Sequence, residues 1–233
     1  MSTRRASPRS AAAGRRPGGA ESERREQLLD AAIGLFAERG IANTTVAQIA
    51  AAGGVTSAMV HYWFDTREKL LDAVVDERLM PLIRAVWEPA GIECGGALDR
   101  VRTLLLRMLD VTEEVPWLPA LWLREIVQEG GLLRERVLKR IPRERNAEFR
   151  QIIGRAQTRG EISPQIMPEL LFFSMLGMVM LPLATAKSWR RINPDMEFVL
   201  DRPRLESHVM TLLMQGLTGR GAARAVRARR SRA

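Results

Sequence analysis

A short run of polar and aromatic side chains is the part of this sequence best suited to contact another macromolecule. Four of them, Ser57, Met59, His61 and Tyr62, fall within residues 56–64. A serine hydroxyl can hydrogen-bond a base edge, a methionine can contact a thymine methyl group, and a histidine N–H can donate to a phosphate. Side chains of these types can therefore contact a nucleic acid, provided that the local structure presents them together.

Two short helices are predicted to position these side chains. Thr45 can accept a hydrogen bond from the first amides of one helix, which a pair of glycines then ends. Thr56 can cap the second helix in the same way. In that helix Val60 and Phe64 share an inward face because they lie four residues apart, so Tyr62 is left on the opposite side. Two helices joined by such a turn predict a helix-turn-helix.

The segment resembles the DNA-binding motif of the TetR (tetracycline-repressor) family of bacterial regulators, with the helix-turn-helix at residues 45–64. The likeness covers residues 22–82. The residues that match the family pattern are Thr44, Thr45, Ile49, Ala50, Gly54, Val55, Thr56, Val60, Phe64, Arg67 and Leu70. Three positions depart from it: Gly53 replaces the usual alanine, Ala58 a glycine, and His61 a tyrosine that commonly touches a DNA phosphate.

The resemblance implies an all-α fold with two domains. Residues 22–82 are expected to form a three-helix helix-turn-helix domain, and residues 83–219 a larger helical domain for effector binding and dimerisation. The flanking segments 1–21 and 220–233 are rich in arginine and in small or turn-forming residues. Both are predicted to be disordered tails, because such segments cannot bury enough apolar surface to fold.

The helix geometry and the resemblance together predict which residues contact DNA. They are Thr44, Thr45, Thr56, Ser57, Ala58, Met59, His61, Tyr62, Trp63 and Arg67. Within this set, Ser57 and Met59 are expected to reach base edges, and His61 and Arg67 to reach phosphates. Trp63 lies nearer the inward edge of its helix, so packing in the core is its alternative role.

The net charge of +9 is distributed unevenly along the chain. Residues 1–20 and 220–233 carry eleven arginines and no acidic residue, which leaves the part between them with a net charge of −2. Residues 22–82 contain six basic and nine acidic side chains. A bulk basic surface is therefore not the basis of DNA binding, and phosphate contacts are expected from a few placed donors, helix N-termini and the tails. The alternative role of the tails is solubility alone.

Beyond residue 70 the sequence pattern predicts helix almost throughout. One helix is predicted from about residue 67 to residue 87, with a kink or break at Pro81. Further helices are predicted between glycine and proline separators. Their ranges are 97–114, 116–129, 132–159, 168–191 and 203–219.

Aromatic and methionine side chains in the larger domain predict a pocket for an apolar effector, with ordinary core packing as the alternative for each of them. The pocket residues are Trp87, Met108, Trp117, Trp122, Phe172 and Met175. The uncharged run 170–186 is slightly short for a bilayer span, and we expect it to form a dimer interface with the helix near 205–217. The interface residues are Ser174, Gly177, Met178, Leu181, Leu205 and Leu212.

Catalytic motifs find little support in the sequence. The two histidines, His61 and His208, show no metal-ligand spacing, and no nucleophile elbow, Walker loop or dinucleotide fingerprint occurs. Carboxylates are abundant, but they are expected to pair with arginines on solvated helix faces. We expect no catalytic residue, metal or cofactor. The single cysteine, Cys94, and the lack of an apolar signal segment fit a cytoplasmic protein outside the membrane.

These features predict a homodimeric, ligand-responsive repressor that reads a palindromic operator in double-stranded DNA and has an unknown small apolar effector as its second partner. One alternative is an effector-independent or nucleoid-type DNA binder, which a sharp operator preference would argue against. The other is a small-molecule binding or sequestering protein with a vestigial helix-turn-helix. Salt-sensitive binding to its own promoter region would separate that case.

Overall fold

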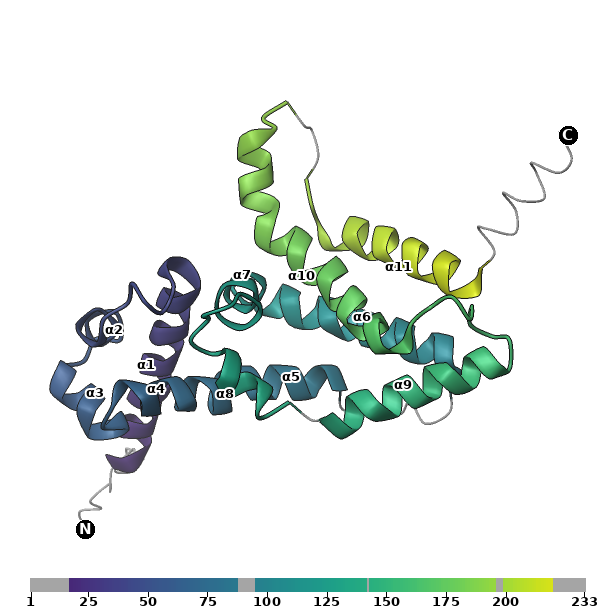
Figure 1. The fold of residues 1–233 in the computed structure, drawn as a ribbon. Helices are drawn as coiled ribbons and strands as arrows, with labels where there is room; N and C mark the ends of the chain where they lie inside the picture. Colours follow the sequence, from purple (N-terminus) through teal and green to yellow (C-terminus); the bar gives the residue numbers. More distant parts are fainter. Residues whose placement is uncertain (1–16, 88–94, 142, 196–198, 220–233) are drawn as a thin grey trace, which may run out of the picture.

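The computed structural model describes residues 17–87, 95–141, 143–195 and 199–219, and within them every regular element is a helix (Figure 1). In chain order the elements are α1 (Pro17–Arg39), α2 (Val46–Ala52), α3 (Ser57–Phe64), α4 (Arg67–Val74), the π-helical turn η1 (Val75–Leu79), α5 (Met80–Trp87), α6 (Ala97–Glu114), α7 (Leu118–Trp122), the π-helical turn η3 (Leu123–Val127), α8 (Arg134–Leu138), α9 (Arg143–Thr158), α10 (Pro168–Ile192) and α11 (Arg202–Thr218). The predicted all-α fold is confirmed. Cys94 and residues 1–16 and 220–233 lie outside the described residues.

The four amino-terminal helices form one small bundle, at the left of Figure 1. Helix α1 packs against α2 and α4, and α3 packs against α2 and α4. Their inward side chains belong to one buried cluster that includes Leu28, Phe36, Ile49, Val60 and Phe64. Spacings of three and four residues place these side chains on the inner faces of short helices. The bundle thus packs against the inner face of α3 and holds this helix in place.

Helices α4, η1 and α5 follow one another without a break from Arg67 to Trp87, as predicted. Pro81 does not end this helix. A proline lacks the amide that an α-helix needs, and the π-helical turn just before it changes the local hydrogen-bond pattern. The helix runs across the expected domain boundary between residues 82 and 83, so the two domains share one element.

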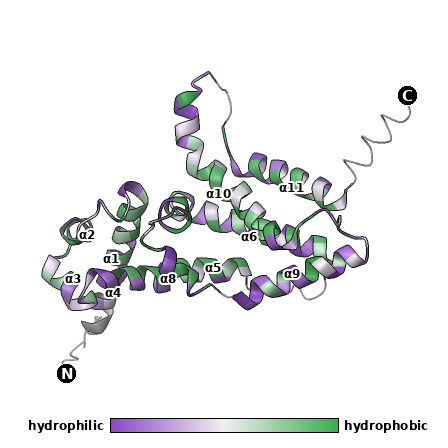
Figure 2. Cartoon of the chain, viewed as in Figure 1, coloured by the Kyte–Doolittle hydropathy of each residue, from purple (hydrophilic) through white to green (hydrophobic). Residues whose placement is uncertain are grey.

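The larger domain is built around a second buried cluster from α6, α9, α10 and α11, with members such as Leu105 and Met175. Figure 2 shows apolar residues along α10 where it passes the other helices of this domain. Arg202 at the start of α11 donates hydrogen bonds to Asp110 and Glu113 on α6. These hydrogen bonds raise the pKa of Arg202 and attach α11 to the domain.

Most of the predicted helices are confirmed, and two expectations are wrong. Helices α6, α10 and α11 agree with the predicted ranges to within one residue, and the range 116–129 shortens to α7 and η3. The single helix expected over 132–159 is instead α8 and α9, because Pro142 cannot donate within a continuous helix. The expected disorder of 1–21 is wrong for residues 17–21, which form the first turn of α1; a proline is well suited to that position.

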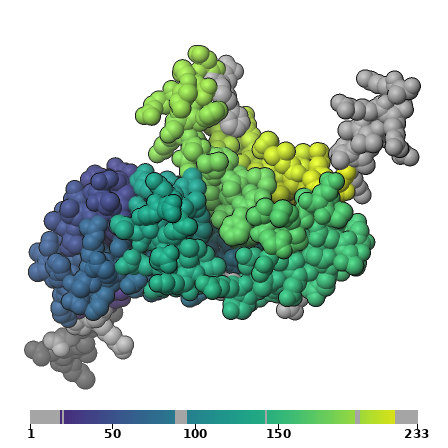
Figure 3. All heavy atoms as spheres, viewed as in Figure 1, coloured from purple at the N-terminus to yellow at the C-terminus, as the bar shows by residue number. Residues whose placement is uncertain are grey.

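The far half of α10 projects from the body of the molecule (Figures 1 and 3). By length and composition alone α10 could cross a membrane, a test that core helices of soluble proteins also pass. Only 22% of its most apolar window is buried. Large side chains such as Phe173, Leu181 and Trp189 are more than half exposed on it. The helix therefore carries apolar surface that this chain leaves uncovered.

Candidate nucleic-acid interface and ligand cavity

Three threonines fix the starts of α2, α3 and α4. Thr45 Oγ1 accepts from the Gln48 amide at 3.2 Å, and the Gln48 side chain accepts from the Thr45 amide at 2.8 Å, which completes a capping box. Thr56 and Thr66 each accept from the amide three residues ahead at 3.3 Å. Thr66 is not among the caps predicted from the sequence, although it directly precedes α4 as Thr45 and Thr56 directly precede α2 and α3. Each capping hydroxyl accepts this hydrogen bond through its oxygen, so its O–H can still donate to another group.

Helix α3 presents an apolar face to the bundle and a mixed face to solvent. Val60 and Phe64 are buried, and the Arg25 guanidinium lies 4.9 Å from the centre of the Phe64 ring. Tyr62 is 76% exposed. Three further residues of α3 are exposed on it, namely Ser57, Ala58 and His61, and Met59 is half-buried. The solvent face of α3 thus presents one large aromatic side chain among small and polar neighbours.

The ring of His61 is already held by the backbone. Its Nδ1 lies 3.0 Å from the carbonyl oxygen of Asp65. Because a carbonyl only accepts, Nδ1 carries a proton, and Nε2 of the neutral ring is then an acceptor. The ring can donate to a phosphate through Nε2 only when it is protonated. The Asp65 carboxylate beside it accepts from Lys69 at 2.7 Å, which lowers the pKa of Asp65.

Two predicted DNA contacts face the protein interior. Thr44 is 1% exposed, and its hydroxyl donates to the Gly40 carbonyl at 2.8 Å. The prediction for Thr44 is therefore wrong, because its hydroxyl satisfies a loop carbonyl inside the fold. Trp63 is half-buried against the amino-terminal cluster and donates through Nε1 to Glu21 at 3.3 Å. Its alternative role, core packing, is the one observed.

The loop that precedes α2 is held from both domains. The half-buried Arg67 donates to the Ile41 carbonyl, so this predicted phosphate contact also orders the loop. From the larger domain, Glu125 on η3 accepts from the Ile41 amide at 3.0 Å. The Glu125 side chain is 5% exposed, and its other oxygen accepts from the Leu132 amide at 3.2 Å. Arg124, also on η3, donates to a carbonyl of α1 at 3.3 Å.

Ion pairs also connect the long helix to its neighbours. Arg136 and Arg140 of the α8 segment reach Asp72 and Asp76 on α4 and η1, with nitrogen–oxygen distances of 3.1 and 2.6 Å. Arg25 of α1 pairs with a glutamate of η1, and its hydrogen bond lowers the pKa of that carboxyl group. These ion pairs thus join different helices, whereas the sequence pattern predicts such pairs only on solvated helix faces. In the described part of the chain, no three His, Cys, Asp or Glu residues are grouped to hold a metal ion.

An apolar cavity of about 280 Å³ lies in the larger domain, between α5, α6, α7, η3, α8 and α10. The predicted residues Trp87, Met108, Trp122 and Phe172 line it, with the rings of Trp87 and Phe172 4.5 Å apart. Residues outside the predicted set also line it, including Ile83, Val86, Ile126, Val127 and Arg134. The other two predicted residues do not: Met175 is fully buried in the second cluster, and Trp117 packs against the first.

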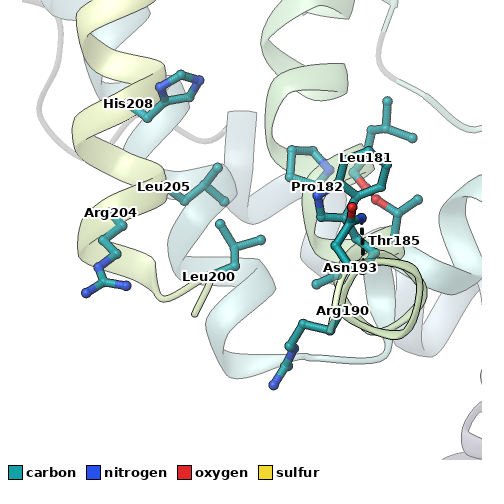
Figure 4. Close-up of a pocket in the computed structure, with 11 residues that line it drawn as sticks. Leu181, Pro182, Thr185, Arg190, Asn193, Leu200, Arg204, Leu205 and His208 are labelled. Atoms are coloured by element: carbon teal, nitrogen blue, oxygen red, sulfur yellow. Dashed lines mark hydrogen bonds between the residues drawn. The ribbon is translucent and has the colours of Figure 1, made fainter. Parts of the chain in front are cut away.

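The expected interface residues fall on two kinds of site. Ser174, Gly177, Leu181 and Leu212 are exposed, and Met178 is half-buried. Leu205 is 3% exposed and belongs to the second cluster, so its prediction as an interface residue is wrong. On α11, Leu205 faces the core while Leu212 is exposed. Figure 4 shows a second pocket between the far half of α10 and α11, with Leu181, Pro182, Thr185 and His208 among its labelled residues.

Comparison with known sequences matches the amino-terminal domain. The family described as "Bacterial regulatory proteins, tetR family" matches residues 28–74. The HTH-type transcriptional repressor KstR2 of Rhodococcus jostii is 34% identical over 94 residues, which are 40% of this chain and 46% of that protein. The HTH-type transcriptional regulator BetI of Brucella anthropi is 42% identical over 85 residues, 36% of this chain and 40% of that protein. The chain thus spans less than half the length of these curated relatives.

Solved structures match most of the chain. The ketosteroid transcriptional regulator KstR2 of Mycobacterium tuberculosis has a TM-score of 0.63 and 18% identity, over 84% of this chain and 95% of that chain. The regulator FadR of Bacillus subtilis, solved with stearoyl-CoA, has a TM-score of 0.61 and 21% identity, over 83% of this chain and 99% of that chain. At these identities the likeness shows the fold alone.

Proposed function

We propose that this chain, whose amino-terminal domain matches the TetR family of bacterial regulators, is a ligand-responsive transcriptional repressor of the cytoplasm. The observation that carries this proposal is the outward face of α3, where Tyr62 and polar neighbours stand exposed on a packed base. Residues of η3 line the cavity in the larger domain, and Glu125 of the same element binds the loop that precedes α2. A site for DNA and a site for a small molecule are thus joined by one element.

In this proposal α3 enters the major groove of double-stranded DNA. Ser57 and Met59 contact base edges, with Ala58 close enough to the groove floor for van der Waals contact. Tyr62 lies on the same face. Phosphates are contacted by the protonated ring of His61 and by Arg67, together with the capping residues Thr45 and Thr56 at helix N-termini.

A second copy of the chain covers the exposed apolar surface of α10 and α11 in this proposal. The exposed side chains there are Leu170, Phe173, Leu181, Trp189, Ile192 and Leu212. The small residues Ser174 and Gly177, exposed on the same helix, permit a close approach of two helices. A dimer presents two α3 helices to a palindromic operator, and the second half-site then binds at high effective concentration.

The element η3 connects the cavity to the reading helices. Ile126 and Val127 line the cavity, while Arg124 and Glu125 bind α1 and the loop before α2. A small molecule that moves η3 therefore also moves the Ile41 loop, from which α2 and α3 take their orientation. This regulates DNA binding only if the molecule binds the two orientations with different affinity.

The proposal is tested by footprinting and fluorescence anisotropy with DNA from upstream of the protein's own coding sequence. We expect one protected palindromic site, with affinity that falls as salt rises. The variant Val86→Phe fills part of the cavity in place of a ligand and is expected to weaken operator binding. Val199→Phe, at an exposed position outside the cavity, is the matched control. Binding of equal strength to any DNA, or no binding at all, would refute the proposal.

A further inference from the structure

One charged side chain lies among the apolar side chains that line the cavity. Arg134 is the only charged residue among the 17 that line it, and it is half-buried. Within the described residues, its guanidinium donates one hydrogen bond, 3.3 Å long, to the Val127 carbonyl at the end of η3. No carboxylate of those residues is within ion-pair distance of it. By contrast, Arg136 and Arg140, from the same segment, are both paired with aspartates.

A second polar group of the same wall lacks a partner. Trp122, which directly precedes η3, lines the cavity, and its Nε1 is buried without a hydrogen-bond acceptor among the described residues. An indole N–H can only donate, and a buried donor without an acceptor is costly. Trp122 is the last residue of α7, next to η3, and Arg134 is the first residue of α8, which packs against η3. Among the lining residues Arg134 and Trp122 are thus the N–H donors; the Trp122 Nε1 is buried from solvent, so a ligand reaches it only if the indole ring turns toward the cavity.

We propose that the cavity takes a medium-chain hydrophobic carboxylate, whose apolar body packs among residues such as Trp87 and Phe172. Its carboxylate accepts hydrogen bonds from the Arg134 guanidinium and the Trp122 indole. Charge-assisted hydrogen bonds of this kind are stronger than neutral ones. The volume of about 280 Å³ is at the small end of ligand sites, which favours a short acid over a bulky ring system. This proposal rests on the cavity being the effector site.

The test uses three probes that share one apolar chain: decanoate, decanol and decyltrimethylammonium. Each is titrated into the full-length, DNA-free protein at pH 8 by isothermal calorimetry, below its micelle concentration. We expect decanoate to bind about tenfold more tightly than decanol, and the cation to bind most weakly. Arg134→Gln should remove the preference for decanoate and leave the affinity for decanol unchanged. Arg134→Lys, which keeps the charge, should retain most of the preference.

Two further variants make the test specific. Trp122→Phe keeps an aromatic wall without the N–H, and it should weaken decanoate several-fold. Lys139→Gln removes a nearby exposed charge outside the cavity and should change nothing. If decanol binds as tightly as decanoate, or if Arg134→Gln keeps the preference in a protein with unchanged circular dichroism, the proposal is overturned. The same holds if no probe binds. Operator binding by the ligand-free protein is measured separately, so failure here is distinguishable from failure of the proposed repressor function.

Discussion

Glu125 offers the sharpest test of how the two domains are joined. Its buried carboxylate accepts from the Ile41 amide at 3.0 Å and from the Leu132 amide at 3.2 Å. Glutamine at this position keeps one carbonyl oxygen and turns an NH2 group toward the other amide. One buried donor then loses its acceptor, at a cost of about 1–3 kcal/mol. Alanine removes both acceptors, so Glu125→Ala is expected to cost roughly twice as much.

The measurement is the free energy of unfolding from urea titrations followed by fluorescence and circular dichroism. Coincident transitions would justify a two-state treatment of both domains. Glu135→Gln, at an exposed position on α8, is the matched control and should change stability by less than about 0.5 kcal/mol. If Glu125→Gln is as stable as the control, the Glu125 carboxylate does not hold the loop before α2, and η3 does not anchor that loop through this residue.

Four further outcomes are expected. His61→Phe should weaken operator binding several-fold, because it keeps an aromatic ring but removes the ring nitrogens that are proposed to contact a phosphate; unchanged affinity in a folded variant would contradict this contact. Gly131→Ala should destabilise the fold by about 1–3 kcal/mol in thermal unfolding, since its Cβ would lie 2.4 Å from the Glu125 carbonyl oxygen. Gly154→Ala, whose added Cβ meets no atom of another element within 4 Å among the described residues, should instead stabilise α9 by about 0.5–1 kcal/mol, and a loss of stability would show crowding at this site. Leu181→Glu should give a monomer in sedimentation velocity, and a persistent dimer would place the interface elsewhere.

The helix-turn-helix could be predicted because its signals are local. A threonine that directly precedes a helical sequence pattern can cap the helix with its own hydroxyl, so the starts of α2 and α3 followed from Thr45 and Thr56. The side of α3 that faces outward followed from the four-residue spacing of Val60 and Phe64. Thr44 shows the limit of this reasoning: its hydroxyl is taken up by the Gly40 carbonyl, and the pattern of the motif does not reveal such a loop contact.

The rest of the site depends on contacts between distant parts of the chain. The hydrogen bond from the Ile41 amide to Glu125 joins residues 84 positions apart, and no periodic pattern in the sequence predicts it. In the larger domain, Phe172 lines the cavity while Met175, one turn later, is in the core. Both are apolar residues on the same helix, and only the packing of neighbouring helices separates a cavity wall from a filled core.

The central claim, that the exposed face of α3 reads DNA, is tested most directly by the affinity of Tyr62→Ala for the operator. Fluorescence anisotropy with the footprinted site would compare this variant with the wild type and with Leu132→Ala, which shortens an exposed apolar side chain outside the DNA-binding domain. Loss of one base contact costs about 1–3 kcal/mol, so Tyr62→Ala should bind about tenfold more weakly while Leu132→Ala binds like the wild type. Equal affinity of a folded Tyr62→Ala protein and the wild type would contradict the claim.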